Sequence, residues 1–290
     1  MIVSLLQLLD RAAVSLWVAA QLLVLSGSCF CLLALLVKGR EAIAAARRAA
    51  GEIRVNVALY AIDVLLVAPV LAVGVTLLRA GMRDGGLALV DEGVWNALGR
   101  TGTFVAVIFL GDFCSYWRHR LEHTKWLWPT HAIHHSDTEM SWLTLSRFHP
   151  VNRLITTSVD VACLALLGFP SWALVANELV RHYYGEFIHA DLPWMYGPLR
   201  HVFVSPVMHR WHHARDLVGA GSNFATVFSV FDRALGTHHV PGLCDVPLGV
   251  TDEMGHGTFG QLAYPFAAWM AELRASRGVA SSAPPESLAE

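Results

Sequence analysis

Charged residues are scarce in this chain: 21 Lys and Arg and 23 Asp and Glu make up 15% of its 290 residues. Soluble domains carry roughly 25%, and a formal net charge of -2 leaves no basic excess to hold a polyanion. The five cysteines include no C-x-x-C pair and no paired spacing, so they indicate neither a disulfide framework nor a cysteine-bound zinc site. With 54% hydrophobic residues, these absences exclude a disordered chain, a nucleic-acid-binding protein and an ordinary water-soluble enzyme.

Hydrophobic residues are concentrated in long runs, and the mean hydropathy is +0.46. Four apolar stretches lie at residues 12–37, 55–78, 101–117 and 154–180. The first has no charge and exceeds the ~20 residues that span a bilayer core. The second contains Asp63 and Pro69, and the third contains Asp112. In the fourth, Gly168 and Pro170 end one helix and start another, which predicts a tight helical hairpin.

Basic residues between the first two stretches set the expected orientation. They are Lys38, Arg40, Arg47, Arg48 and Arg54, against only Glu41 and Glu52. The positive-inside rule places this connection, which we expect to form a surface helix over residues 38–54, in the cytoplasm. The second stretch then crosses the membrane away from the cytoplasm, and the third crosses back to it. The hairpin enters and leaves the membrane on the cytoplasmic side. Residues 118–153 and 181–290 are therefore predicted to share the cytoplasmic face.

These stretches predict an all-α fold: an integral membrane, multi-pass helical bundle with about four membrane-embedded helices, the fourth being the hairpin, and a cytoplasmic helical cap. We find no internal repeat or second domain, so residues 1–274 are expected to form one unit. The Ser-, Pro- and Ala-rich residues 275–290 are expected to be a disordered tail. The N-terminus lacks a basic n-region and a small-residue cleavage site, so no removable signal peptide is expected.

Histidines are clustered: twelve of the fifteen lie between residues 119 and 213, where an even spread would put about five. Three groups repeat a spacing, HRLEH at 119–123, HAIHH at 131–135 and HRWHH at 209–213. On a helix, residues i, i+3 and i+4 project from one side, so each group directs two or three imidazoles the same way. One such group arises readily by chance. Three groups, separated and interleaved with Trp, Arg and apolar residues, indicate a metal site rather than a histidine-rich tract.

Eight imidazoles exceed what one ion takes, because a tetrahedral zinc has four ligands and a catalytic zinc usually takes three from the protein. The sequence therefore predicts two metal ions. The eight candidate ligands are His119, His123, His131, His134, His135, His209, His212 and His213. Imidazole binds Fe, Zn, Cu or Ni, so the ligand type alone leaves the metal open.

Six segments, in this order, resemble the fatty acid hydroxylase / sterol desaturase superfamily. They are DFCSYWRHRLEH (112–123), LWPTHAIHHS (127–136), RFHP (147–150), FIHAD (187–191), VFVSPVMHRWHH (202–213) and FDRALGT (231–237). The resemblance covers roughly residues 100–250. It implies that the three histidine boxes hold a di-metal centre, usually described as di-iron, which activates O2 to hydroxylate or desaturate a lipid C–H bond. Recombinant material can carry zinc instead.

The same resemblance extends the site beyond the three boxes. His189 in FIHAD matches the family's extra histidine and is the expected ninth ligand. Gly185 stands where some members place a further ligand. The candidate for the tenth is therefore His182, two helical turns before His189, with Glu186 as the alternative. The residues expected to support the ligands, by accepting an imidazole N–H or by packing behind it, are Asp112, Glu186 and His149.

The expected function is O2-dependent hydroxylation of a lipid, fatty acyl or sterol C–H bond, with desaturation of a similar substrate as the alternative. Such bonds are beyond acid–base chemistry, so no catalytic residue is predicted besides the metal ligands. The substrate would come from the bilayer. Electrons would come from a separate reductase, ferredoxin or cytochrome, because no G-x-G-x-x-G motif predicts a bound flavin or nicotinamide. Two other classes stay open: a zinc-dependent membrane hydrolase and a metal transporter, although the first two stretches offer a transport path only Asp63.

Overall fold

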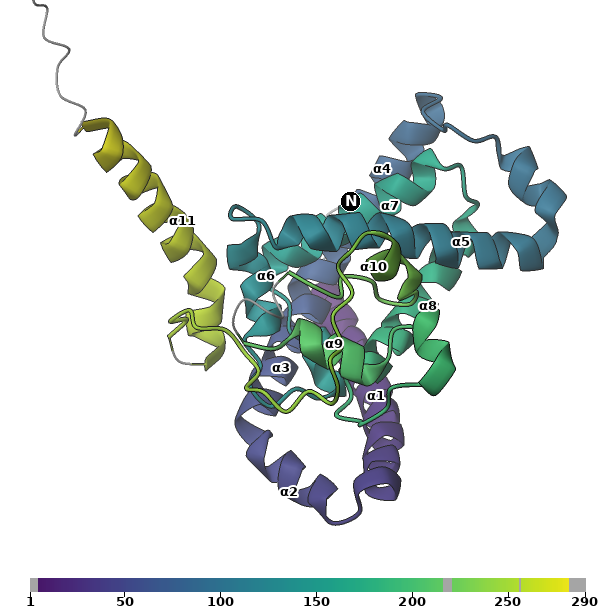
Figure 1. Cartoon of the computed structure of the whole chain (residues 1–290). Coiled ribbons are helices and arrows are strands. Elements are labelled where there is room, and N and C mark those ends of the chain that lie inside the picture. Colours follow the sequence, from purple (N-terminus) through teal and green to yellow (C-terminus); the bar gives the residue numbers. More distant parts are fainter. Residues whose placement is uncertain (1–4, 216–220, 256, 282–290) are drawn as a thin grey trace, which may run out of the picture.

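The computed structural model describes residues 5–215, 221–255 and 257–281, and Figure 1 shows a helical protein over these ranges. Within them, the one contact of β type is an isolated antiparallel bridge between Ala214 and Leu248. The all-α prediction is therefore confirmed. Long helices form the first part of the chain, and short helices joined by irregular segments carry most of the histidine boxes.

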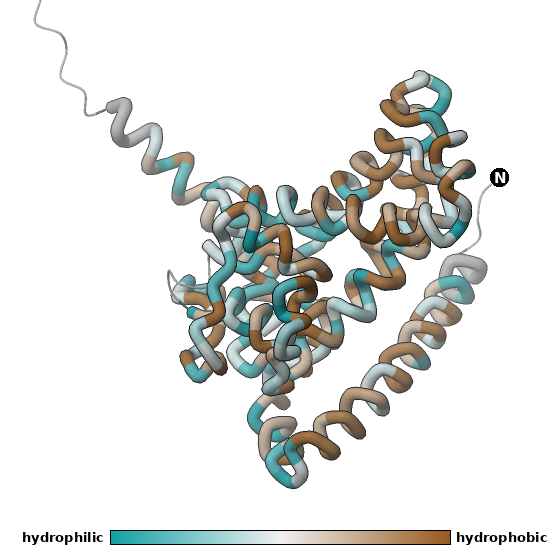
Figure 2. The backbone as a smooth tube through the Cα atoms, turned by 45° about the vertical axis from the view of Figure 1, so that its right-hand side comes forward, coloured by the Kyte–Doolittle hydropathy of each residue, from teal (hydrophilic) through white to brown (hydrophobic). Residues whose placement is uncertain are grey.

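Helices of 8 to 34 residues make up the N-terminal part. They are α1 (Leu5–Lys38), α2 (Glu41–Arg48), α3 (Ala50–Ile62), α4 (Ala68–Asp84) and α5 (Glu92–Glu122), with a π-helical turn, η1 (Asp63–Val67), joining α3 to α4. Among the described residues, three segments are long and apolar enough to cross a membrane: 10–38, 50–84 and 92–122. Figure 2 shows α1 as a long, largely hydrophobic helix at the edge of the molecule. Its outward side chains, such as Leu25 and Leu36, are exposed, as a bilayer-facing surface requires.

The three candidate spans match the first three apolar stretches of the sequence, with wider bounds. The third starts earlier than its apolar run because Asp91 caps α5, accepting a hydrogen bond from Gly93 N at 2.7 Å. The surface helix expected over residues 38–54 is divided in two. Gly39, which has a φ of +58°, lies between α1 and α2. The first part of the expected helix is α2, which ends at Arg48, and the second part belongs to α3, which begins at Ala50 and starts the second candidate span.

The fourth apolar region forms the two helices of the predicted hairpin, α7 (Pro150–Leu166) and α8 (Ser171–His189), joined by a tight turn. The two arms pack on α5 and make few contacts with each other. Gly168 at the tip has a φ of +69°, a conformation that favours glycine. The tip packs against the start of α5, where the Trp95 indole donates to the Leu167 carbonyl at 2.8 Å. Neither arm, of 17 and 19 residues, is among the three candidate spans.

Gly168→Ala is expected to destabilise the protein. A Cβ at this position would overlap the Val90 carbonyl oxygen, and a left-handed conformation alone costs an L-residue about 1–2 kcal/mol. Thermal unfolding of detergent-solubilised protein measures the loss. The control is Gly51→Ala, a helical position where a Cβ meets nothing within 4 Å. Equal melting temperatures for the two variants would show that the tip is not held against the α4–α5 connection.

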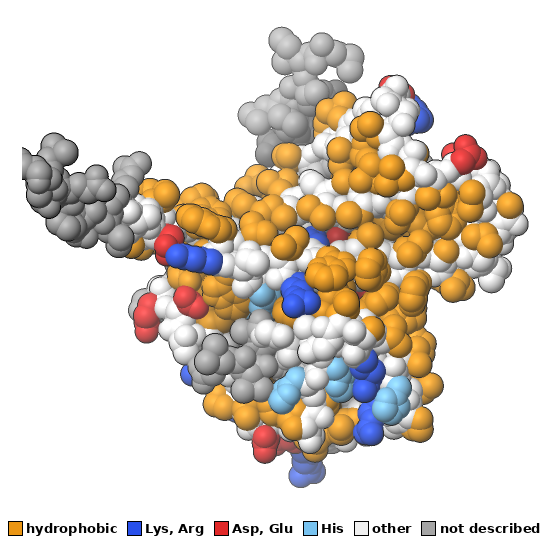
Figure 3. All heavy atoms as spheres, turned by 45° about the horizontal axis from the view of Figure 1, so that its top comes forward, with side chains coloured by type: hydrophobic (Ala, Val, Ile, Leu, Met, Phe, Trp, Pro, Cys, Tyr) orange, Lys and Arg blue, Asp and Glu red, His pale blue; other side chains and the backbone are white. Residues whose placement is uncertain are grey.

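Short elements carry or surround the histidine boxes. They are α6 (Trp128–His135), the 3-10 helices η2 (Trp142–Ser146) and η3 (Gly197–His201), α9 (Pro206–His212) and α10 (Val230–Ala234). A buried cluster that includes Tyr116, Ile188 and Phe224 joins α5 and α8 to the segment before α10. Figure 3 shows hydrophobic side chains over a broad area of one face, mostly in its upper half, with the visible histidine side chains in its lower half. The molecule thus has an apolar part and a polar part.

The last helix, α11 (Gly257–Ser281), packs against α6 and α3 and projects from the body in Figure 1. It continues past residue 274, so residues 275–281 are helical where a disordered tail was expected. The rest of that expected tail, residues 282–290, lies outside the described residues. The helix contains Pro265.

Candidate metal centre

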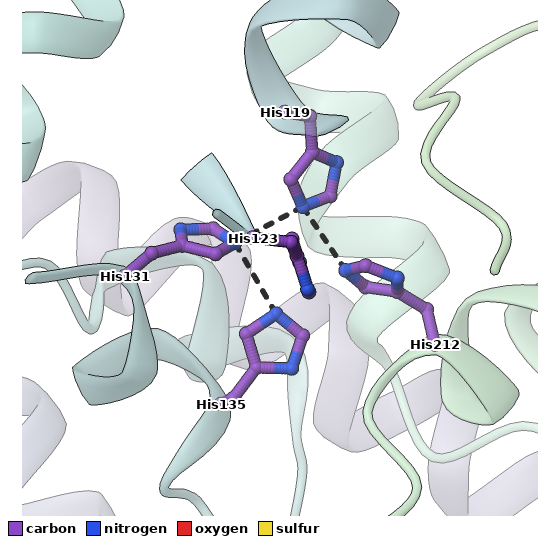
Figure 4. A group of neighbouring side chains, drawn as sticks. All are labelled: His119, His123, His131, His135 and His212. Carbon is purple, nitrogen blue, oxygen red and sulfur yellow. Dashed lines mark hydrogen bonds between the residues drawn. The ribbon is translucent and has the colours of Figure 1, made fainter. Parts of the chain in front are cut away.

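Five histidines converge at the end of α5. His119 in α5, His123 at its C-cap, His131 and His135 on α6 and His212 on α9 each offer one ring nitrogen, and these nitrogens lie within 4.8 Å of one another. Figure 4 shows the five rings facing a common point. The Nε2 atom of His119 is 3.1 Å from that of His131 and 3.0 Å from that of His212. These five residues are the first histidine group.

Four more histidines form the second histidine group. They are His134 on α6, His189 at the end of α8, His209 on α9 and His213 at the C-cap of α9, all buried. The Nε2 atom of His189 is 3.1 Å from that of His134 and 3.0 Å from that of His209. The two groups adjoin, because the rings of His135 and His213 stack with their centroids 4.4 Å apart. The eight box histidines and His189 are thus all brought together.

The two HH doublets of the sequence divide their members between the groups. Successive residues on a helix are rotated by about 100°, so His134 and His135 point to different sides of α6. His131 and His135 are four residues apart and share a side, and both belong to the first group. On α9 the doublet is divided in the same way, with His213 joining His209 in the second group.

The short helices α6 and α9 carry most of these histidines, and each begins with a helix-start signal that can be recognised in the sequence. Proline occupies the first turn of each, Pro129 in α6 and Pro206 in α9, where the missing N–H removes no helical hydrogen bond. Ser205 caps α9 by accepting a hydrogen bond from Met208 N at 3.2 Å. The helical spacing inferred for the boxes is therefore confirmed in the structure.

Backbone carbonyls fix the ring tautomer of three histidines. The Nδ1 atoms of His119, His189 and His212 lie 2.7–2.8 Å from the carbonyl oxygens of Phe224, Gly185 and Ser222. A carbonyl oxygen only accepts, so Nδ1 carries the proton and donates it. In a neutral imidazole the other nitrogen, Nε2, then bears a lone pair. In all three residues it is this atom that points into the histidine group.

The facing nitrogens fit metal ions. Burial lowers the pKa of His212 to about 4, so this ring is neutral at pH 7. Its Nε2 lone pair faces that of His119, and two lone pairs 3.0 Å apart repel unless a cation lies between them. Two nitrogens bound at right angles to one ion, each at about 2.1 Å, are about 3.0 Å apart. In the second group, both nitrogens of the buried His213 have no hydrogen-bond partner among the described residues.

Glu122 is a buried carboxylate beside the first group that the sequence analysis missed. It is 1% exposed, and its Oε2 atom lies 3.8 Å from Nδ1 of His131. Arg118 donates to it at 2.5 Å, and Asn152 and Thr156 donate to its Oε1 atom at 2.9 and 2.8 Å. It supplies negative charge next to imidazoles that carry none. The signal available in the sequence was its i, i+4 spacing from Arg118.

Asp112, expected to accept an imidazole N–H, holds a backbone segment instead. It is fully buried, and its oxygens accept from the backbone N–H groups of residues 226–228 at 2.7–3.1 Å. Arg181 also donates to it, at 3.1 Å. In the described part of the chain, no histidine is among its hydrogen-bond partners. Phe224, whose carbonyl accepts from His119, lies two residues before this segment.

His182, the candidate tenth ligand, lies outside both groups. Its seven-residue separation from His189 is about 10 Å along the helix, so sharing a helical face does not bring the two rings together. Its Nε2 atom is 3.6 Å from Glu186 Oε1, and Glu186 accepts a hydrogen bond from Ser26 at 3.0 Å. This turn of α8 therefore contacts α1 rather than either histidine group.

His149 also lies away from the groups. Its Nδ1 atom accepts from Val151 N at 3.2 Å and caps α7, so Nε2 carries the proton and donates to the Leu262 carbonyl at 3.2 Å. It connects α7 to α11.

Gly185 contributes its carbonyl to His189, and a Cβ at this position would lie 3.0 Å from Leu145. The close approach explains why this position carries no side chain.

A cavity of about 150 Å³ reaches the histidines from the side of the long helices. Its lining includes His119 and His131 of the first group and His134, His189 and His209 of the second. The other walls come mainly from α5, α7 and α8. Both histidine groups therefore border one space that a substrate could occupy.

A family model described as fatty acid hydroxylase matches residues 104–237. This segment contains both histidine groups, the hairpin and Asp112. The match covers slightly less than half of the chain, and over this region it bears out the resemblance noted in the sequence.

Among curated proteins, the chain is similar to ornithine lipid hydroxylase OlsE of Rhizobium tropici, with 32% identity over 161 residues, 55% of this chain and 49% of that protein. It is also similar to alkylglycerol monooxygenase of Homo sapiens, with 33% identity over 131 residues, 44% of this chain and 29% of that protein. A third relative is the very-long-chain aldehyde decarbonylase GL1-8 of Oryza sativa subsp. indica (32% over 135 residues, 44% and 48%). The chain spans half the length of these relatives or less. No solved structure matches it.

Proposed function

We propose that this protein is a membrane oxygenase in which two iron ions, held by the two histidine groups, use O2 and external electrons to hydroxylate a C–H bond of a lipid. The observation that carries the proposal is the convergence of nine imidazoles in two adjoining groups beside one cavity. The names of two relatives, ornithine lipid hydroxylase and alkylglycerol monooxygenase, support a lipid substrate and an oxygen-inserting reaction. They also favour hydroxylation over desaturation, which remains the alternative.

Each histidine group would hold one ion. Bound iron supplies the redox chemistry with O2 that side chains lack. The protein supplies the positions: the carbonyls of Ser222, Phe224 and Gly185 hold three rings with Nε2 directed inward. Glu122 supplies negative charge beside the first group, and burial of the rings keeps bulk water away.

We further propose that the α7–α8 hairpin lies in the membrane beside the three candidate spans and that the histidine groups lie on the cytoplasmic side. The hairpin tip packs against the start of α5, at the opposite end of that helix from His119. The basic residues between α1 and α3 favour the cytoplasm for that connection. A separate cytoplasmic reductase, ferredoxin or cytochrome would then reach the centre, and a lipid would arrive from the bilayer.

Metal content and O2 dependence test the proposal. Protein purified in detergent and loaded with iron is expected to hold about two ions per chain and to convert lipid only with both O2 and a reductant. Zinc-loaded protein is the control, because zinc has no redox chemistry and should leave the lipid unchanged. One ion per chain, or turnover that persists with zinc and without O2, would favour a metal-dependent hydrolase instead.

A further inference from the structure

The last helix, α11, turns its polar side chains toward the rest of the protein. Between residues 259 and 272, four side chains carry a polar group: Gln261, Tyr264, Trp269 and Glu272. The first three donate hydrogen bonds of 3.1, 2.6 and 2.9 Å to Ser136 Oγ, Asp252 and the Trp126 carbonyl, respectively. Glu272 forms an ion pair with Lys125. Each polar side chain in this part of the helix is thus engaged by the protein.

The outward side of α11 is apolar. Its large exposed side chains, between 43% and 82% accessible, are Phe259, Phe266, Met270 and Leu273. Successive members are seven, four and three residues apart, so all four project from one side of the helix. A helix that faces water has the reverse pattern, with polar residues outside and apolar residues against the core. These four residues, the outer stripe, therefore indicate a nonaqueous partner.

A protein partner fits the outer stripe poorly. A stable protein–protein interface buries about 800 Å² on each partner and uses about 20–30 residues of it. The outer stripe offers four large side chains along one helix that projects from the body (Figure 1). A bilayer has no such requirement, because a helix in the membrane plane inserts only one apolar side between the lipid head groups and the acyl chains.

The outer stripe also adjoins a surface that the membrane is expected to cover. Phe113, Trp117 and Leu121 are exposed at four-residue intervals along the third candidate span, which ends at residue 122. Trp126 follows that end by four residues, is exposed, and accepts the hydrogen bond from Trp269 near the middle of α11. Tryptophan is enriched where a membrane span meets the interface. α11 is therefore attached at the level at which α5 leaves the apolar region.

α11 itself is not among the three candidate spans, although it has 25 residues. We propose that α11 lies along the bilayer surface at the end of α5 that carries the histidine groups, with its outer stripe inserted beside the lipid head groups. The occupant of this surface is phospholipid, whose acyl chains take the four side chains out of water. The proposal goes beyond the oxygenase reaction, because it concerns the membrane and neither the metal nor the substrate.

The contact fixes the metal centre relative to the membrane, since α11 is bound to α6. Gln261 donates to Ser136, the C-cap of α6, and Leu262 packs on the buried cluster that contains Ile133 of the same helix. The Leu262 carbonyl also accepts from His149 at 3.2 Å. α6 carries three of the nine grouped histidines. Lipid contact at the outer stripe thus sets the distance between those rings and the bilayer surface.

Photochemical crosslinking in the intact protein tests this placement. The variants are Phe259→benzoylphenylalanine and Phe266→benzoylphenylalanine, each reconstituted in phosphatidylcholine vesicles, irradiated and digested for mass spectrometry. We expect phospholipid adducts at both positions, with Leu25→benzoylphenylalanine, on the exposed side of α1, giving the reference yield. The matched control is Ala275→benzoylphenylalanine, at an exposed residue on the opposite side of α11. Adducts at residues 259 and 266 should exceed those at 275 by about tenfold, as transfer of one phenylalanine side chain out of water implies.

Three results would overturn the proposal. Covalent dimers in place of lipid adducts would assign the outer stripe to a second copy of the chain. Yields at residues 259 and 266 as low as at 275 would leave the stripe in water, and equally high yields at all three would immerse the whole helix. A variant that melts as the parent does in detergent is correctly folded, and Phe259, the more exposed position, serves alone if the Phe266 variant melts lower. Iron and turnover do not enter the readout, so the oxygenase proposal can fail while this one stands, and the reverse.

Discussion

His212→Ala and His134→Ala are each expected to lower lipid turnover by at least about a hundredfold, more than loss of a supporting residue causes. Each removes one Nε2 donor: His212 faces His119 in the first group, and His134 faces His189 in the second. The metal content of the purified variants, measured by mass spectrometry beside turnover, should fall toward one ion per chain. Membrane insertion, measured by resistance to alkaline extraction, should be unchanged.

His201→Ala is the matched control for these two variants. His201 is exposed at the end of η3 and lies outside both histidine groups, so this variant should keep two ions and full turnover. Full activity in His212→Ala or His134→Ala would remove that residue from the centre. Loss of both ions in either variant would mean that the groups bind cooperatively, as the stacked rings of His135 and His213 allow.

Asp112→Ala is expected to lower the free energy of unfolding by about 3–5 kcal/mol, because it removes the nearest carboxylate of the buried Arg181 guanidinium and leaves only Asp160, at 4.0 Å. It also leaves three backbone N–H groups, those of residues 226–228, without an acceptor. The segment 222–224 just before them provides the carbonyls that hold His119 and His212. Metal retention in the first group should therefore fall together with the melting temperature of the solubilised protein.

Asp84→Ala serves as the control for this experiment, since the Asp84 side chain is 70% exposed and its loss should change stability by less than about 0.5 kcal/mol. If Asp112→Ala lost stability but kept both ions, contacts other than Asp112 would hold the two carbonyls, with Asp232 the nearest carboxylate that does so. That residue accepts hydrogen bonds from Phe224 N and Ala225 N at 2.7 and 3.0 Å. A variant as stable as the parent would contradict the role assigned to Asp112.

The helices and the histidine donors could be predicted because both depend on local spacing. The i, i+4 relation places His131 beside His135 whatever the rest of the chain does. Hydropathy over about 20 residues marks a span without knowledge of its neighbours. The hairpin was equally predictable, because Gly168 and Pro170 end and start helices by their own backbone restrictions.

The supporting contacts could not be predicted, because they join segments far apart in the sequence or use the main chain. The carbonyls of Gly185, Ser222 and Phe224 have no side-chain signature. The helical periodicity correctly puts His182 on the same side of α8 as His189. It does not show that the two side chains are separated along the helix axis by too great a distance to share an ion. Asp112 was singled out for its carboxylate in an apolar run, yet its partners follow from how the 226–228 segment folds over α5.

If each histidine group holds one ion, the divided HH doublets would keep the distance between the two ions nearly fixed. His134 and His135 are bonded neighbours whose Cα atoms lie 3.8 Å apart, and His212 and His213 repeat the arrangement on α9. A rigid movement of α6 or α9 would carry a donor of each ion with it and leave their separation nearly constant. A movement of α5, which contributes only to the first group, or of α8, which contributes only to the second, would change the donors of one ion alone.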